Sequence, residues 1–409
     1  MSLEWPVRTL GEFVRLQRGH DLTASEQKVV GVPVMGSAGP NGTHNQALTK
    51  GPGVVIGRSG ASVGRVHYSE VDYWPHNTCL YVTDFLGNSP QFAYYLLQTL
   101  ALAAYNSGSA QPSLNRNLIY SVTVRVPRRD VQDEIAKMLS ALDDRIALLR
   151  ETNTTLEAIA QALFKSWFVD FDPVRAKQQG FAPAGMDEAT AALFPDSFEE
   201  SALGQVPKGW RQGTVSDFAQ VHRGSVNPGG NGDTMFEHYS LPAFDTGQMP
   251  VRELGAAIKS NKTSVPRDAV LLSKLNPHIR RVWLPLVPGP HAVCSTEFLV
   301  FASVEPASRE FAYCAFVAAP FQERLRQLVT GTSNSHQRVK PDSVLTLSAV
   351  VPPRQALDAF TAAVRPMFER VGRNRLQAQT LATLRDTLLP RLISGQLRLP
   401  EAEALAAAA

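Results

Sequence analysis

Cysteine is scarce in this sequence of 409 residues, and its distribution excludes two kinds of architecture. The three cysteines, Cys79, Cys294 and Cys314, are odd in number and far apart, and no two form a CxxC pair. The pattern provides neither a disulfide framework nor the paired ligands of a structural zinc site. We therefore interpret all three as buried structural thiols.

Long hydrophobic runs are also missing. No apolar run approaches the roughly 20 residues that a membrane-spanning helix needs. The segment Met1–Trp5 lacks the basic residues and apolar stretch of a secretory signal. With 44% hydrophobic and 19% charged residues, the chain is expected to form two or three globular domains in the cytoplasm, without a membrane partner.

Catalytic motifs are absent as well. The string nearest to an amino-methyltransferase motif, Val351–Arg354 (V-P-P-R), lacks the amide or carboxylate that receives the target amine. Ser59–Val66 ends in Arg-Val where a phosphate-binding loop requires Lys followed by Ser or Thr. Asp268 lacks the second acid of a nuclease site, and neither HExxH nor GxSxG occurs. We predict a non-catalytic chain with no metal and no cofactor of its own.

An internal duplication is the main positive feature, because residues 1–170 resemble residues 206–398. The offset is 205 at first, 216 to 218 further on, and 225 from Pro127 onward: Trp5/Trp210, Leu10–Phe13/Val215–Phe218, Arg18/Arg223, Arg65/Arg281, Thr78/Thr296, Tyr95/Tyr313 and Pro127/Pro352. Such a repeat predicts a two-headed molecule with pseudo-twofold symmetry. Double-stranded DNA is itself twofold and is an obvious partner.

The two heads, residues 1–130 and 209–355, combine short strands with helical segments. The predicted strands are Gly53–Gly57, Thr78–Val82 and Ser121–Val126 in the first head, and Ala269–Ser273, Thr296–Val300 and Val344–Val350 in the second; Gln91–Leu97 and Arg309–Leu328 are more helical. Each head is therefore expected to be a mixed α/β domain.

A long heptad helix follows each head, at residues 131–172 and 356–398. The predicted seams are Ile135, Leu139, Leu142, Ile146, Leu149, Asn153, Leu156, Ala160, Leu163 and Trp167, and Phe360, Val364, Met367, Val371, Asn374, Ala378, Leu381, Arg385, Leu388 and Leu392. Each contains one Asn, a residue that fixes register at some cost in stability. We expect the first helix to end near Asp172-Pro173 and the second at Gly395.

The seams indicate that the two helices pack on each other, in a parallel or an antiparallel sense. Antiparallel packing would place the heads at opposite ends, whereas parallel packing would bring them together. Between the first helix and the second head, residues 173–208 read as a linker with one short helix around Ala189–Phe194. Residues 399–409 form an Ala-rich tail, interpreted as frayed helix or disorder.

Positive charge is concentrated in the heads. Residues 1–130 carry 11 Lys/Arg and 8 Asp/Glu, and residues 209–355 carry 15 and 11, whereas residues 131–208 carry 7 and 13. A phosphate-binding surface requires such a basic excess, although ordinary domains reach the same values.

Polar and basic loops recur at equivalent places in the two heads. Arg and Lys suit guanine edges and phosphates, Asn and Gln suit adenine edges, and Ser and Thr suit phosphate oxygens. The alternative is that these loops are solvated turns. The predicted DNA-binding residues are Arg18, His20, Arg58, Ser59, Arg65, Ser109, Gln111, Asn115, Arg116 and Asn117 in the first head, and Arg223, Lys274, Asn276, His278, Arg280, Arg281, Thr332, Asn334, His336, Gln337 and Arg338 in the second.

Three segments carry a resemblance to a known family. Ala162–Arg175, the stretch Gly185–Trp210 and Thr383–Gly395 resemble the conserved regions of type I restriction-modification specificity subunits. The resemblance covers nearly the whole chain and includes the duplication. It implies two α/β target recognition domains, residues 1–130 and 209–355, that each read half of a split, asymmetric DNA sequence in the major groove.

The same resemblance implies that residues 131–172 and 356–398 are antiparallel coiled-coil helices that fix the unread gap. It also implies double-stranded DNA and two kinds of protein partner: two modification subunits, which bind S-adenosylmethionine and methylate adenine, and two restriction subunits, which use ATP and Mg²⁺. The alternatives are a specificity subunit of a related bifunctional or phage-defence methylation system, a coiled-coil scaffold without a DNA role, and a self-contained methyltransferase or nuclease.

Overall fold

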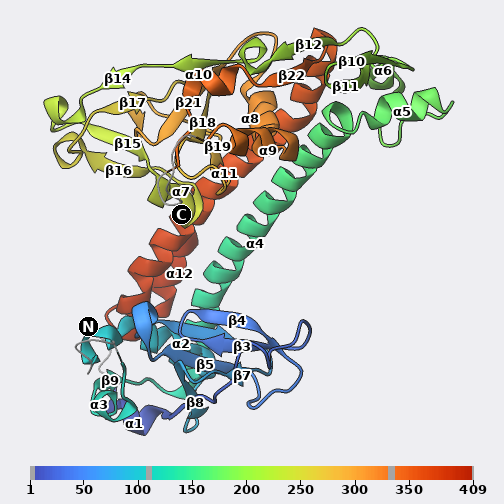
Figure 1. The fold of residues 1–409 in the computed structure, drawn as a ribbon. Coiled ribbons are helices and arrows are strands. Elements are labelled where there is room, and N and C mark those ends of the chain that lie inside the picture. Colours follow the sequence, from blue (N-terminus) through green and yellow to red (C-terminus); the bar gives the residue numbers. More distant parts are fainter. Residues whose placement is uncertain (1–4, 107–112, 330–336, 408–409) are drawn as a thin grey trace. The chain divides into compact units, whose positions relative to one another are not determined.

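The structure is a computed structural model that describes residues 5–106, 113–329 and 337–407. The chain divides into two compact units (Figure 1). The first unit contains Met1–Leu148 together with Gln377–Ala409, and the second contains Leu149–Leu376. Each unit thus holds one head and part of both long helices.

The first head is built on a four-stranded antiparallel sheet in the order β2-β8-β5-β6 and a three-stranded sheet in the order β4-β3-β7. Helix α2 packs against β5 and β6. The elements are β1 Val7–Thr9, α1 Leu10–Phe13, β2 Arg15–Arg18, β3 Val32–Gly36, β4 Gly39–His44, β5 Gly53–Gly57, η1 Gly60–Ser62, β6 Val66–Ser69, β7 Trp74–Pro75, β8 Cys79–Asp84, α2 Pro90–Thr99, η2 Leu102–Tyr105, α3 Arg116–Ile119 and β9 Thr123–Arg125.

The second head repeats this topology. A four-stranded sheet has the order β13-β21-β18-β19, and a five-stranded sheet has the order β14-β17-β20-β15-β16. The elements are β12 Arg211–Thr214, η3 Val215–Asp217, β13 Ala219–His222, β14 Ser225–Val226, η4 Pro228–Asn231, β15 Met235–Tyr239, α7 Leu241–Gly247, β16 Val251–Leu254, η5 Gly255–Ala257, β17 Lys262–Ser264, β18 Ala269–Ser273, β19 Val282–Trp283, β20 Ala292–Cys294, β21 Phe298–Ser303, α8 Arg309–Val317, α9 Ala319–Gln327, α10 Pro341–Leu345 and β22 Ser348–Val351.

The central strands β5 and β18 have the bounds that the sequence predicts. All five residues of each strand are buried, because the strands lie inside their sheets and are covered on both faces. This explains why both segments are continuously apolar instead of alternating. All three cysteines are buried and free, as predicted.

Strand register corrects one pairing of the repeat. Gly57 pairs with Cys79 in the first head, and Ser273 pairs with Phe298 in the second. The offset is therefore 219 at β8 and β21, so Thr78 corresponds to Glu297 and not to Thr296. The pairing of identical threonines was wrong because the second head has three residues more than the first between these two strands, whereas that pairing allows for two.

The following helix has the same offset. Ser89 caps α2 and Ser308 caps α8, each accepting a hydrogen bond from the backbone N–H three residues later. Tyr313 therefore corresponds to Tyr94, and the predicted pairing of Tyr313 with Tyr95 was also off by one. Tyr95 instead donates from its hydroxyl to Asp143 of the long helix, at 2.7 Å.

The long helices are α4, Arg129–Phe168, and α11, Arg354–Ile393, each of 40 residues. Helix α4 ends before the expected Asp172-Pro173, and a new helix, α5, spans Asp172–Gln178. Proline suits a helix start, so it opens α5 instead of closing α4. Helix α11 ends as predicted, two residues before Gly395, which has a φ of 76°.

The two helices pack antiparallel in both units. In the second unit, Asn374 Nδ2 donates to Asn153 Oδ1 at 2.8 Å, and the rings of Trp167 and Phe360 are 5.9 Å apart. In the first unit, Arg385 forms an ion pair with Asp143. Later residues of α4 thus meet earlier residues of α11, which decides between the two senses that the seams alone left open.

Most predicted seam residues are buried. They are Ile135, Leu139, Leu142, Ile146, Leu149, Asn153, Ala160 and Trp167 of α4, and Phe360, Val364, Val371, Asn374, Ala378, Leu388 and Leu392 of α11. Leu156, Leu163, Met367, Leu381 and Arg385 are half-buried instead. Near Leu163 the deeper residue is Phe164, because this end of α4 also packs on the second head, where Phe164 and Phe311 are 5.3 Å apart.

Residues 173–208 are more structured than a linker with one short helix. Besides α5 they contain α6, Glu188–Ala191, and a hairpin of β10, Phe198–Ser201, and β11, Gly204–Pro207. Phe194 is buried in the core of the second unit, with its ring 5.3 Å from Trp167 and 6.0 Å from Trp210. This segment is therefore part of the second unit's core.

Two other expectations change at the end of the second head and in the tail. The predicted strand Val344–Val350 is partly wrong, because Pro341 begins helix α10 and the strand β22 starts only at Ser348. The tail forms helix α12, Leu399–Ala407. None of the helices in the described ranges is both long enough and apolar enough to cross a membrane.

The buried amide pair generates a stability prediction. Asn153 and Asn374 are only 6% and 1% exposed, so Asn374→Ala leaves the Oδ1 atom of Asn153 without its donor. We expect a loss of about 1–3 kcal/mol in stability, read as a lower thermal unfolding midpoint. The double variant Asn153→Leu/Asn374→Leu should recover this loss. Gln379→Ala, on the exposed face of α11, is the control; a single-variant loss no larger than the control's would contradict the prediction.

Candidate nucleic-acid interface

Parts of the three predicted loops of the first head meet around one open cavity of about 690 Å³. They come from the end of β2, the turn after β5 and the start of α3. The cavity is lined by Gln17, Arg18, Gly19, His20, Asp21, Arg58, Leu80, Ser113, Leu114, Asn115 and Arg116. Five of the predicted DNA-binding residues, separated by nearly 100 positions in the chain, therefore share one surface.

Close backbone packing fixes the first loop. A Cβ atom on Gly19 would lie 2.1 Å from the carbonyl oxygen of His76, so only glycine fits between Arg18 and His20. The backbone N–H of His20 donates to Pro75 at 2.7 Å. The constraint is weaker in the second head, since a Cβ on Gly224 would meet side-chain atoms, the nearest being Ser264 Oγ at 2.2 Å. The glycine of the repeated Arg-Gly pair is thus required by the backbone in the first head.

Backbone hydrogen bonds join the second and third loops. Arg58 donates its N–H to the Thr78 carbonyl at 2.9 Å, and its own carbonyl accepts from Leu114 at 2.8 Å. Asn115 Oδ1 then accepts from the N–H of Asn117 at 3.0 Å and caps α3. The backbone that carries the cavity side chains of these two loops is therefore fixed by hydrogen bonds.

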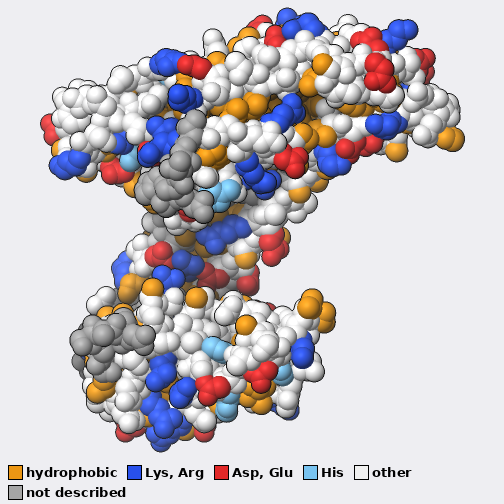
Figure 2. Space-filling model, in the orientation of Figure 1, with side chains coloured by type: hydrophobic (Ala, Val, Ile, Leu, Met, Phe, Trp, Pro, Cys, Tyr) orange, Lys and Arg blue, Asp and Glu red, His pale blue; other side chains and the backbone are white. Residues whose placement is uncertain are grey.

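The cavity combines three guanidinium groups with an imidazole. Arg18 is 3.3 Å from Asp21, and Arg116 donates to the Leu16 carbonyl at 3.0 Å. Among the described residues the Arg58 side chain has no hydrogen-bond or ion-pair partner. Figure 2 shows Lys and Arg side chains grouped on the first unit. Such a surface can bind phosphate oxygens or the acceptor edge of guanine.

Other predicted residues of the first head lie outside the cavity lining. Ser59 bridges to Ser113 in the backbone and donates its N–H to Ser37 Oγ at 3.3 Å. Arg65 and Asn117 are exposed, in the turn before β6 and on α3 respectively. Ser109, Gln111, Thr332, Asn334 and His336 lie outside the described residues.

The second head has the same loop junction. Leu275 bridges to Arg338, and Val339 donates its N–H to the Lys274 carbonyl at 3.1 Å. These contacts correspond to those of Ser59 with Ser113 and of Leu114 with Arg58, at offsets of 216 and 225. The loops that the sequence paired between the heads are therefore structurally equivalent at this junction.

Carboxylates hold three of the predicted arginines in the second head. Arg281 makes two 2.8 Å contacts with Asp245, whose pKa is lowered by this guanidinium. Arg338 makes contacts of 3.2 and 3.0 Å with Glu297, and Arg223 lies 2.8 Å from Asp342. Sequence reasoning missed all three acids. A signal for Asp245 existed, because its helix α7 is an insertion relative to the first head.

The other predicted residues of the second head are less engaged. Asn276 has a φ of 50°, and its backbone N–H donates to the Gln337 carbonyl at 2.8 Å. Its Oδ1 atom is buried without a hydrogen-bond partner among the described residues. His278 and Arg280 are exposed, and Arg280 borders a cavity of about 350 Å³ beside α9.

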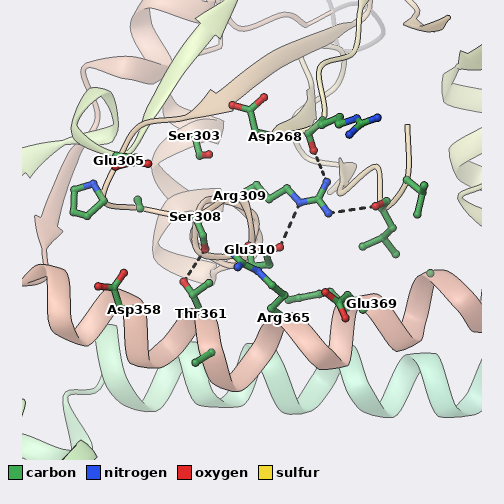
Figure 3. A pocket seen from close by; sticks show the side chains of 18 of the residues that line it. Asp268, Ser303, Glu305, Ser308, Arg309, Glu310, Asp358, Thr361, Arg365 and Glu369 are labelled. Carbon is green, nitrogen blue, oxygen red and sulfur yellow. Dashed lines mark hydrogen bonds and ion pairs between the residues drawn. The ribbon is translucent and has the colours of Figure 1, made fainter. Parts of the chain in front are cut away.

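A larger charged cleft of about 760 Å³ lies between the second head and α11 (Figure 3). Its floor holds Glu310, which is 3% exposed and lies 3.3 Å from Arg309 and 3.4 Å from Arg365 of α11. Ser308 and Thr361 are hydrogen-bonded at 2.9 Å. A buried carboxylate needs such partners, so these contacts tie the head to its helix.

Comparison with known proteins shows which proteins this chain is similar to. Residues 2–158 match the model of the type I restriction modification DNA specificity domain. The chain is 25% identical over 326 residues to the type I restriction enzyme MjaIX specificity subunit of Methanocaldococcus jannaschii, covering 76% of this chain and 70% of that protein. It is 24% identical over 361 residues to the HindI specificity subunit of Haemophilus influenzae, covering 75% and 77%.

Over about three quarters of its length the chain is similar to type I restriction-modification specificity subunits. Its fold agrees with that similarity. The crystal structure of a type I restriction-modification S subunit from M. genitalium superposes with a TM-score of 0.63 at 14% identity, covering 95% of this chain and 96% of that one.

Gly19 provides a test of the loop geometry. Because its Cβ would collide with backbone and not with a flexible side chain, we expect Gly19→Ala to cost about 1–3 kcal/mol by overpacking. Hydrogen exchange should become faster in residues 18–21 and 75–79. Gly247→Ala is the matched control, since its Cβ would meet nothing within 4 Å. Equal behaviour of the two variants would contradict the close approach.

Proposed function

We propose that the chain is the DNA-reading subunit of a type I restriction-modification complex and that each head reads one half of an asymmetric bipartite sequence. The observation that carries the proposal is the equivalent loop junction in the two heads, built on the same backbone contacts but with different side chains. Equivalent frames with different side chains suit two different half-sites. Similarity to type I restriction enzyme specificity subunits supports the same role.

The side chains suggest how each half-site is read. In the first head, Arg58 and Arg116 would approach guanine edges or phosphates from the cavity. In the second head, the exposed Arg280 would approach a phosphate or a guanine edge. These roles follow from chemistry and position, and each remains a prediction.

The helices are proposed to fix the unread gap. Each is continuous over 40 residues, about 60 Å at 1.5 Å per residue. The buried pair of Asn153 and Asn374 supports a single register, because any shift would leave two amides unpaired in an apolar seam. A helix pair with one register is suited to act as a ruler.

The proposed partners are double-stranded DNA, two modification subunits and two restriction subunits. In this proposal the modification subunits bind S-adenosylmethionine and methylate adenine, and the restriction subunits use ATP and Mg²⁺. The chain itself supplies the address and no catalytic group, and the complex acts on DNA in the cytoplasm. The specificity-subunit family is non-catalytic, which supports this division of labour.

A head exchange tests the proposal. Methylome sequencing of a host with and without the gene should give a methylated adenine motif with two parts. Replacing residues 1–130 by the head of another family member should change one part and leave the other unchanged, because the second head has its own core. The restored first head is the control. If both parts changed, or neither did, the two-head proposal would be wrong.

A helix insertion tests the ruler. Seven residues added to both helices at facing positions preserve the seam and lengthen it by about 10 Å. We expect the gap between the two half-sites to grow by about 3 base pairs, at about 3.4 Å per pair, with the half-sites unchanged. A four-residue insertion, which breaks the heptad phase, should abolish methylation. An unchanged gap after the seven-residue insertion would show that the helices do not set it.

A further inference from the structure

The two heads differ in how their predicted arginines are held, and this difference bears on DNA affinity. In the first head, the described contacts of Arg18, Arg58, Arg65 and Arg116 include one ion pair, the single 3.3 Å contact of Arg18 with Asp21. In the second head, Arg223, Arg281 and Arg338 each have a carboxylate partner, and two of these pairs are bidentate.

None of the three acids of the second head has an acidic counterpart in the first. Glu297 stands at the position of Thr78 by strand register. Asp342 stands at the position of Asn117, since α3 and α10 begin 225 residues apart. Asp245 lies on α7, which is inserted between β15 and β16, whereas the equivalent strands β3 and β4 are joined by a two-residue turn.

We propose that Asp245, Glu297 and Asp342 restrain the arginines of the second head and thereby suppress its binding to unrelated DNA. The inference rests on the proposed DNA-reading function. A guanidinium that is already neutralised by a carboxylate releases no counterion from DNA unless the pair opens. Base contacts in the correct half-site supply the free energy that opening the ion pair requires, whereas phosphate contacts alone do not.

The three arginine–carboxylate pairs differ in solvent exposure and therefore in how easily they open. Arg281 is 15% exposed and doubly bonded to Asp245, so it is the most firmly held of the three. Arg223 and Asp342 are both well exposed, so this pair can open without disturbing the core. The first head, with fewer restrained guanidinium groups, then supplies most of the salt-dependent attraction to phosphates.

A reciprocal exchange of one side chain tests the inference. The full chain with its modification subunit is prepared as wild type, Asp342→Asn and Asn117→Asp, and fluorescence anisotropy measures binding to the cognate bipartite duplex and to an unrelated duplex over a salt series. Asp342→Asn should bind the unrelated duplex severalfold more tightly, with a salt slope steeper by about 0.9. Asn117→Asp, which places a carboxylate at the position equivalent to Asp342, should do the opposite.

The matched control is Asp233→Asn, an exposed acid of the second head with no ion pair among the described residues. Asp245→Asn and Glu297→Gln, with thermal unfolding checked, should also tighten binding to the unrelated duplex. If Asp342→Asn behaves like the control, or weakens only cognate binding, the carboxylates do not act as restraints. If wild type fails to distinguish the two duplexes, the proposed function itself is wrong.

Discussion

The antiparallel pairing of the two long helices is the constraint on which the rest of the structure depends. Each head is completed by it, because residues of α4 and α11 belong to the apolar core of both units. The pairing is specified by a hydrogen bond between two buried amides, Asn153 and Asn374, in a seam that is otherwise mainly apolar. Apolar contacts tolerate sliding, whereas a buried amide without its partner does not. Register therefore depends on the least hydrophobic part of the seam.

Periodicity predicted the repeated parts of the fold well. The strands β5 and β18, the two long helices and most of the seam follow from apolar patterns whose side chains can all be buried in only one way. Prediction failed where tertiary packing widened a buried face, as at Phe164, or where a proline opened a new helix, as at Pro173. The repeat itself was misaligned by one residue at Thr78, because identical residues are a poorer guide than strand register.

The candidate interface was predictable as a set of loops but not as a distribution of charge. Arg18, Arg58 and Arg116 were found from their recurrence and do line one cavity. The carboxylates that hold Arg281 and Arg338 come from Asp245 and Glu297, 36 and 41 positions away, and no local pattern pairs them with these arginines. Ion pairs between residues far apart in the sequence depend on the fold, and the number of charged residues in a segment does not predict them.

The segment between the first helix and the second head has a consequence for how such genes can recombine. Phe194, in this segment, packs between Trp167 of α4 and Trp210 at the entry to the second head. An exchange with its crossover near residue 208 would join halves of one aromatic cluster that did not arise together. A crossover that exchanges the second head should therefore be tolerated at fewer positions of this segment than a segment outside the core would allow. Sequence diversity of the heads should accumulate more readily where the crossover does not divide an aromatic cluster.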